Sequence, residues 1–154
     1  MRPQAHVAAS LALWSWGRGP AWEAPLDVLA GNLPDLDRSV AKAIGVTRRD
    51  HHRWVTHSLA GWLPVSAAVL AICPAPPARR AVAALWVHLL LDSYADGIAW
   101  LWPLHKDKIG LFRGPPSKLD RGWHTPAPLT SRLGRVEAGM WAAAALGAVV
   151  RRRT

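Results

Sequence analysis

Residues 81–92 read Ala-Val-Ala-Ala-Leu-Trp-Val-His-Leu-Leu-Leu-Asp, an apolar run that contains one histidine and one aspartate. A spacing of four residues on a helix places His88 and Asp92 on one face, about 6 Å apart, where they can share one ion. Asp96 continues that face one turn later. Leucines fill the other faces, and an unpaired aspartate in such apolar surroundings is costly. The run therefore predicts a helix on which a cation or an arginine neutralises Asp92.

Uncharged stretches elsewhere in the chain predict further apolar helices. Residues 59–73 and 136–150 are such stretches, the second with a single glutamate, and 81–104 is longer but carries polar residues. A helix needs about 20 apolar residues to span a bilayer, so none of the three is an unambiguous span. The turn Pro74-Ala-Pro-Pro77 predicts a helical hairpin that is embedded in a membrane or lies against one. A soluble core of buried helices is the alternative.

The fold class that we expect is all-α, a helical bundle with membrane-embedded or membrane-associated hydrophobic helices, because β-branched alternation is almost absent. Helices are expected near residues 4–16, 36–45, 57–73, 79–102 and 130–150. The length of 154 residues favours one domain over 1–154. Residues 113–135 are basic and rich in Pro and Gly, which predicts a loop before a C-terminal hydrophobic helix at 136–150.

Composition limits the kind of site and the partners. The single cysteine, Cys73, excludes an internal disulfide and a zinc site made of several thiolates. A metal site would have to be built from histidine, aspartate and glutamate. The formal net charge of +9 favours an anionic partner, either a nucleic acid or an anionic lipid surface. Nucleic-acid binding is the weaker of the two, because no recognition motif is evident.

Four groups of potential metal ligands follow one another along the chain. They are His6; Asp35 and Asp37; His51, His52 and His57; and His88 and Asp92. Imidazoles and carboxylates without thiolates suit zinc, manganese or iron. Taken together, the four groups predict a site for two or more ions.

Each group also has a purely structural explanation. The single histidine of the first group can be a packed or capping residue. The two aspartates of the second can form an Asx turn and a helix N-cap. The adjacent histidines of the third can be solvated loop residues, and Thr56 can cap the helix that follows them. The last pair can be a buried His–Asp or Asp–Arg pair.

Three motifs occur in a fixed order, Asn32-Leu-Pro-Asp-Leu-Asp37, His52-Arg-Trp-Val-Thr-His-Ser58 and His88-Leu-Leu-Leu-Asp-Ser93. Together they resemble the YdjM-type family of membrane-bound, metal-dependent hydrolases. The resemblance covers about residues 6–112, and His6 with its small-residue apolar helix fits the same pattern. That family looks distantly related to the zinc-dependent phospholipase C and nuclease superfamily. The resemblance therefore implies an all-α fold around a cluster of zinc ions.

The resemblance also implies a ligand set and a reaction. Metal ligation is implied for His6, Asp35, Asp37, His52, His57, His88 and Asp92. The implied activity is that of a hydrolase. If metals bind, a phosphoester is the expected substrate, because one ion lowers the pKa of water toward about 7 and a second steadies the phosphoester oxygens. Two residues depart from the family pattern. Arg38 stands where a histidine often follows the second aspartate, which could remove a ligand, and Trp54 replaces a small residue, which could narrow access.

Two further residues are predicted to act in the reaction. Arg53 lies between His52 and His57, where its guanidinium could hold a phosphate in bidentate fashion. A salt bridge from Arg53 to a nearby aspartate is the alternative. Asp96 is predicted to orient a ligand histidine from outside the metal's own ligands.

Charge placement predicts the cellular location. Basic residues flank the central hairpin, whereas its tip carries only Arg79 and Arg80. The positive-inside rule then places the ligand cluster on the cytoplasmic side of the cell's inner membrane. The final arginines, residues 151–153, oppose this orientation if 136–150 spans the membrane. We expect membrane lipid as a partner and a phosphoester as substrate, with a non-catalytic, metal-stabilised membrane protein as the alternative function.

Overall fold

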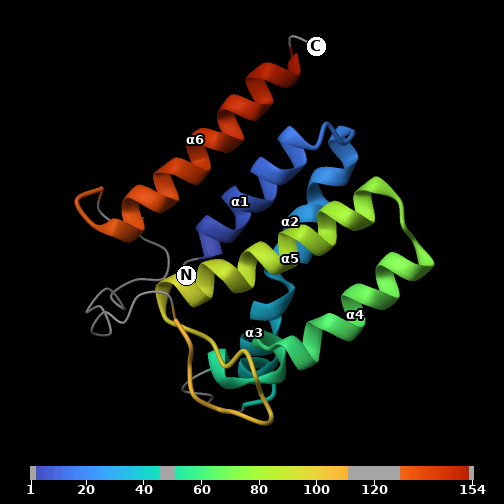
Figure 1. Cartoon of the computed structure of the whole chain (residues 1–154). Coiled ribbons are helices and arrows are strands. Elements are labelled where there is room, and N and C mark those ends of the chain that lie inside the picture. Colours follow the sequence, from blue (N-terminus) through green and yellow to red (C-terminus); the bar gives the residue numbers. More distant parts are fainter. Residues whose placement is uncertain (1–2, 46–50, 111–128, 153–154) are drawn as a thin grey trace.

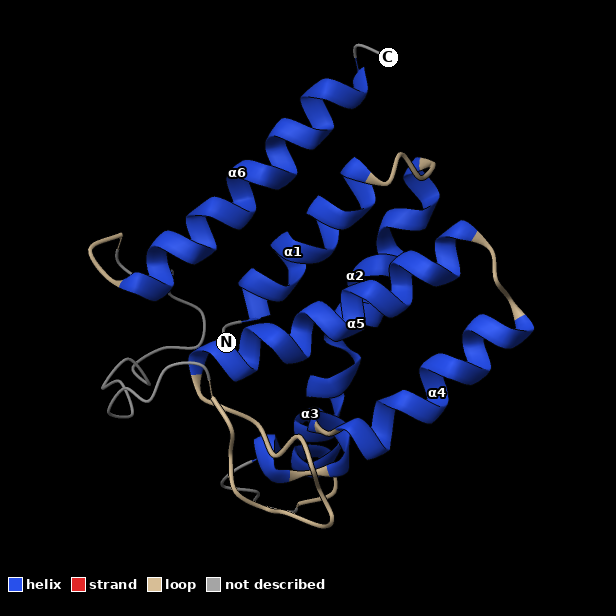
Figure 2. Cartoon of the chain, viewed as in Figure 1, coloured by secondary structure: helices blue, strands red, loops and turns tan. Residues whose placement is uncertain are grey.

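A computed structural model describes residues 3–45, 51–110 and 129–152, and these residues form a bundle of helices (Figures 1 and 2). The only strand-like pairing within the described ranges is an isolated antiparallel bridge between Ile98 and Ile109. The expected all-α class is therefore confirmed. Most of the predicted loop at 113–135 lies outside the described residues.

The helices follow the chain in a simple order. The α-helices are α1 (Pro3–Trp16), α2 (Ala24–Asn32), α3 (Leu36–Ala43), α4 (Leu59–Ile72), α5 (Pro76–Ala95) and α6 (Arg132–Arg152). The 3₁₀ turns are η1 (Ala21–Glu23), η2 (Leu33–Asp35), η3 (His51–Arg53) and η4 (Val55–His57).

The bundle has two distinct ends. Helix α1 packs between α6 on one side and α2 and α5 on the other, and α4 pairs with α5 as a hairpin. In Figure 1, α1, α4 and α6 run upward while α2 and α5 run downward. Helices α1 and α4 therefore begin where α2 and α5 end, and we call this the lower end. The turns η2, η3 and η4 gather there as well.

Helix α5 ends earlier than predicted. The sequence predicts a helix over 79–102, but α5 stops at Ala95 and the chain reverses at Gly97, whose φ is +76°. Only glycine adopts this backbone conformation readily, so the helix cannot continue through that position unbroken. The following loop is fixed to the lower end, because Ala99 N–H donates to the carbonyl of His52 and Leu59 N–H donates to that of Trp100.

Helix α2 was not predicted, because its buried positions are not apolar and its apolar residues are exposed, which is the reverse of the pattern in a soluble protein. Asp27 and Gly31 are its buried residues, while Leu26 and Leu29 are exposed. A search for an apolar buried face therefore misses it. Pro25 in the first turn favours the start of the helix. Proline has no backbone N–H, and an N–H at this position would have no partner within the helix.

Large apolar side chains point outward over much of the surface. Helix α6 is long and apolar enough to cross a membrane, and only 17% of its most apolar window is buried. It confirms and extends the predicted C-terminal helix. Helix α4 is apolar but shorter. Together with α5 and the turn between them, it forms the predicted hairpin. Most of the buried apolar residues are alanines, three of them in α1, and the larger ones are Leu85, Leu89 and Ile98.

Candidate metal centre

Asp92 lies at the centre of a group of histidines near the end of α5. Its Oδ2 atom is 3.1 Å from His88 Nε2, 3.4 Å from His52 Nε2 and 3.5 Å from His57 Nε2. Its Oδ1 atom is 3.2 Å from His6 Nε2 of α1. Four imidazoles from three separate parts of the chain thus surround one fully buried carboxylate.

Asp35 supplies a second carboxylate from the end of η2. Its Oδ1 atom is 3.3 Å from His51 Nε2, 3.6 Å from His57 Nε2 and 3.8 Å from His88 Nε2. His57 and His88 therefore face both carboxylates. We call these residues the His/Asp cluster, and its members are His6, Asp35, His51, His52, His57, His88 and Asp92.

Hydrogen bonds at the outer ring nitrogens orient two of these histidines. His88 Nδ1 lies 2.7 Å from the carbonyl oxygen of Gly31, to which a ring N–H can donate. His57 Nδ1 lies 3.2 Å from Thr56 Oγ1, and the Thr56 hydroxyl donates to Asp37 Oδ2 at 2.6 Å. A proton on Nδ1 leaves the Nε2 lone pair free to bind an ion, and metal-binding histidines are commonly oriented in this way.

The carboxylates hold positive charge at the cluster. Burial alone would lower the pKa of His57, but Asp35 and Asp92 outweigh it and raise that pKa to about 9. Burial would raise the pKa of Asp35, but its contacts with the imidazoles of His51 and His57 hold it well below the usual range. The cluster therefore keeps a positive charge between its carboxylates, and a metal cation can take the place of that proton.

The donor atoms fit a divalent ion. The four atoms Asp35 Oδ1, His57 Nε2, His88 Nε2 and Asp92 Oδ2 belong to a group whose ligand atoms all lie within 4.8 Å of one another. Ligand atoms of a tetrahedral ion with bonds of about 2.0–2.2 Å are themselves about 3.3–3.6 Å apart. The Nε2 atoms of His57 and His88 are buried and make no hydrogen bond within the described part of the chain.

A second set of donors adjoins the first. His51, His52 and His57 form another group within the same distance limit, so the two groups share His57. His6 contacts the other carboxylate oxygen of Asp92, Oδ1, and stacks on His88 with ring centroids 3.8 Å apart. The donor set is therefore larger than one ion requires.

A family model described as YdjM inner membrane protein matches residues 1–151. The chain belongs to this family. No curated protein and no solved structure matches it. The YdjM assignment makes the chain a membrane protein, in agreement with the outward apolar face of α6. The more distant relation to the phospholipase C and nuclease superfamily stays a prediction.

Six of the seven ligands predicted from the YdjM resemblance come together in the structure, namely His6, Asp35, His52, His57, His88 and Asp92. Asp37 is not seen in contact with these residues: its Oδ2 accepts from Thr56, and its Oδ1 is buried without a hydrogen bond within the described residues, so ligation by Asp37 stays a prediction. His51 was a potential ligand by residue type but was not among the ligands that the resemblance implies, yet it contacts Asp35 and joins the second group.

The structural explanations for these residues can now be compared with their contacts. Asp35 occupies the N-cap position of α3 but makes no side-chain capping hydrogen bond, since its carboxylate faces the histidines. Thr56 does not cap α4; Ser58 does, because its Oγ accepts from Gly61 N–H. His51 and His52 are not solvated loop residues, since both contact carboxylates of the cluster.

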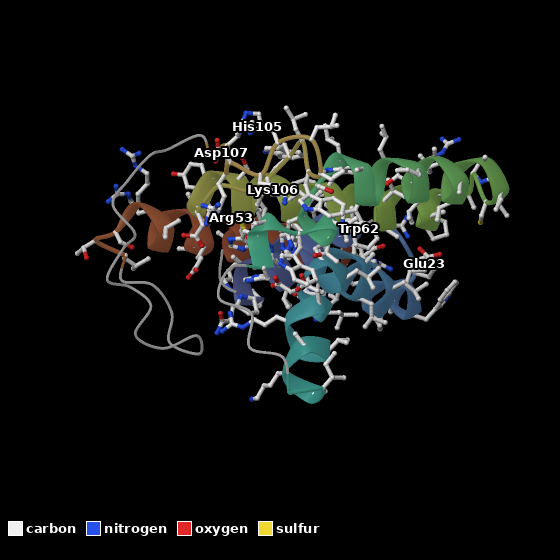
Figure 3. The ribbon with its side chains drawn as sticks, turned by 90° about the horizontal axis from the view of Figure 1, so that it is seen from below. Glu23, Arg53, Trp62, His105, Lys106 and Asp107 are labelled. Atoms are coloured by element: carbon white, nitrogen blue, oxygen red, sulfur yellow. The ribbon has the colours of Figure 1, made fainter. Side chains whose placement is uncertain are left out.

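The two predicted catalytic residues lie at the edge of the cluster. Asp96 Oδ2 is 3.9 Å from His52 Nδ1, on the ring side opposite to Asp92, and Asp96 is half exposed. Arg53 is exposed in η3, directly after His52 (Figure 3). Both positions suit the roles predicted from the YdjM resemblance, and the roles themselves stay predictions.

Proposed function

We propose that this protein is a membrane-embedded, metal-dependent hydrolase that acts on a phosphoester. The observation that carries the proposal is the inward direction of the Nε2 atoms of His57 and His88, whose Nδ1 atoms are hydrogen bonded away from the centre. Membership of the YdjM inner membrane protein family supports the membrane location. The hydrolase chemistry rests on the donor set and on the family resemblance.

Asp35, His57, His88 and Asp92 would hold one divalent ion, and His51 and His52 would form a second position that shares His57. His6 would support the first position from its contact with Asp92. Zinc suits this mixture of imidazoles and carboxylates, with manganese and iron as alternatives. A bound divalent ion supplies Lewis acidity and makes water more acidic at neutral pH. The Arg53 guanidinium would bind the phosphate oxygens, and Asp96 would fix the orientation of His52.

Partial exposure of the cluster favours catalysis over a purely structural ion. The side chains of Asp35 and His51 are 15% and 14% exposed, while those of His57 and Asp92 are almost fully buried. Structural zinc sites are closed by four protein ligands, whereas catalytic sites keep one position open. The exposed edge at Asp35 and His51 is where a phosphoester would enter, and Arg53 belongs to the same turn as His51.

The experiment compares His88→Ala with His105→Ala in detergent-purified protein. His105 is exposed in the loop after α5, and within the described residues its charged partner is the exposed Asp107, so it serves as a matched control. We expect the wild type and His105→Ala to contain divalent metal by elemental analysis and to hydrolyse a model phosphodiester. His88→Ala should lose both properties while keeping its helical circular dichroism.

The alternative is a non-catalytic membrane protein that is stabilised by metal. Metal bound by the wild type without hydrolysis of phosphomonoesters or phosphodiesters would favour this alternative. A folded wild type that takes up no zinc, manganese or iron would contradict both readings.

A further inference from the structure

A line of exposed apolar residues runs along α2, η2 and α3. We call it the α2–α3 stripe, and its members are Leu26, Leu29, Leu33, Leu36, Val40 and Ile44. Their exposed fractions lie between 38% and 65%. Consecutive members are three or four residues apart, which is the spacing of one helix face. Single exposed leucines are ordinary on protein surfaces, but six at this spacing indicate a surface that is covered by something apolar.

Helix α3 divides into three faces. Leu36 and Val40 form the apolar face, while Ala41 is buried against the body of the protein. Arg38 and Lys42 are exposed about half a turn away from Leu36 and Val40, as 100° per residue requires. An apolar face opposite basic residues is the pattern of a helix that lies in the boundary between lipid and water.

The direction of α3 agrees with that placement. Figure 1 looks almost along its axis, while Figure 3, turned by 90°, shows it lengthwise as the cyan helix below the centre. The long helix α5 runs across the picture in both views. Helix α3 therefore lies crosswise to α5 at the lower end of the bundle, as an interfacial helix lies crosswise to helices that cross a bilayer.

Lipid is the occupant that the rest of the molecule favours. The chain belongs to an inner membrane family, and α6 presents an apolar, mostly unburied surface of membrane-spanning length. The α2–α3 stripe continues this outward apolar character along α2 to Leu26. Lys42 at the edge of α3 would meet anionic headgroups, in keeping with the net charge of +9.

We propose that α3 lies in the lipid–water boundary of the membrane, with Leu36, Val40 and Ile44 among the acyl chains just below the headgroups and Lys42 near anionic headgroups. Asp35, the N-cap of α3 and a member of the His/Asp cluster, would then lie at the depth of the lipid headgroups. Lipid contact by α3 does not require metal or hydrolysis, so it can fail or hold independently of the proposed function.

The test places a fluorescent label at single cysteines in a Cys73→Ala background, since Cys73 is the only cysteine of the chain and is exposed. Labels at Val40→Cys and Lys42→Cys are compared in nanodiscs of phosphatidylethanolamine and phosphatidylglycerol that hold one protein copy each. We expect spin-labelled lipid to quench the label at 40 several-fold more than the label at 42. Aqueous iodide should give the opposite order.

A second variant keeps the test decisive. With the label at Leu36→Cys, Val40→Asp should lower lipid quenching several-fold, whereas Val40→Leu should preserve it. An unchanged thermal melt in both variants shows that they are folded, because residue 40 is exposed. Equal lipid quenching at 40 and 42 would overturn the proposal. So would protection of position 40 from both quenchers, or protection that requires two copies per disc, because protein and not lipid would then cover the stripe.

Discussion

Two buried clusters of ionisable residues lie at opposite ends of α5, and they differ in what neutralises their carboxylates. We call Glu23, Asp27 and Arg80 the upper cluster and the His/Asp cluster the lower cluster. At the upper end Arg80 donates from Nε to Asp27 Oδ2 at 3.1 Å and pairs with Glu23 through Nη2. At the lower end Asp35 and Asp92 of the His/Asp cluster face imidazoles, and the Nε2 atoms of His6, His57 and His88 make no hydrogen bond within the described part of the chain.

The comparison separates a cluster that contains its own cation from one that can accept a cation, although Asp27 Oδ1 in the upper cluster is also buried without a hydrogen bond within the described residues. A guanidinium is permanently charged and shaped to bind two carboxylates, so the upper cluster carries its own cation. Neutral imidazoles supply lone pairs but no charge, so the carboxylates of the lower cluster need a proton or a metal ion. Both clusters include residues of α5, and substitutions can therefore test them side by side.

The largest difference is expected between Asp92→Asn and Asp27→Asn. Both residues are fully buried and the change is identical, but only Asp92 contacts four imidazole Nε2 atoms. We expect Asp92→Asn to lose its bound metal and its phosphodiesterase activity. Asp27→Asn should retain metal at the wild-type ratio, as measured by elemental analysis of the folded fraction. Equal metal loss in both variants would mean that the two clusters do not differ in this way.

Arg80→Met is expected to act on stability and not on metal content. It would leave Glu23 and Asp27 buried without their cation, and breaking a buried ion pair costs about 3–5 kcal/mol. The exposed neighbour Arg79→Met is the control and should change the free energy of unfolding little. Denaturant titration in detergent measures both. A stability of Arg80→Met equal to that of Arg79→Met would contradict a structural role for the upper cluster.

Removal of metal by a chelator should destabilise the wild type and Arg80→Met by the same amount, and Asp92→Asn not at all. An ion present at 100 to 1,000 times its dissociation constant stabilises the folded state by about 2.7–4.1 kcal/mol. For a chain of this length that corresponds to a fall in melting temperature of about 5–15 °C. A melting temperature of the wild type that does not respond to chelation would count against metal binding at the lower cluster.

The sequence predicted local geometry better than it predicted where helices end. The pairing of His88 with Asp92 follows from fixed helix geometry, and the structure shows it at 3.1 Å. The end of α5 depends on Gly97, whose positive φ a hydropathy pattern does not reveal. Helix α2 could not be predicted from a buried apolar face, because its buried residues are Asp27 and Gly31 and its leucines are exposed.

The convergence of distant ligands could not come from spacing. His6 and Asp92 lie on different helices, and their placement in one site was predicted from their residue types and from the family resemblance, not from their spacing. The same resemblance implied both Asp35 and Asp37, but residues two apart on a helical turn point about 200° apart. Only Asp35 faces the histidines, and Asp37 instead accepts from Thr56.

Gly31 allows two helices to approach where a ligand histidine is oriented. A Cβ there would lie 2.1 Å from Ser10 Oγ, while the next nearest atom, Ser10 Cβ, is 3.4 Å away. Gly31→Ala should therefore cost about 1–3 kcal/mol by overpacking. Because the Ser10 hydroxyl causes the clash, Ser10→Ala should restore most of the loss in the double variant.

Measurement of unfolding and of metal affinity in both Gly31 variants separates packing from ligand orientation. Gly139→Ala is the control, since a Cβ there meets nothing within 4 Å. The Gly31 carbonyl accepts from His88, so the single variant should also bind metal more weakly. If the double variant is no more stable than Gly31→Ala, the contact with Ser10 is not what requires glycine.

Substitution of Thr56 should give the smallest effect, because Thr56 contacts only the outer ring nitrogen, Nδ1, of the ligand His57. Thr56→Val removes the hydroxyl that links His57 Nδ1 to Asp37, while Thr56→Ser keeps it. Loss of a group that orients a metal ligand typically weakens metal affinity by about 10–100-fold, and we expect about tenfold here because the direct ligands remain. The backbone carbonyl of Thr56 accepts from Trp62 Nε1 in either variant, so folding should change little. Competition with a metal-binding dye would measure the affinity. If Thr56→Ser weakens it as much as Thr56→Val does, packing of the methyl group and not the hydrogen-bond chain orients His57.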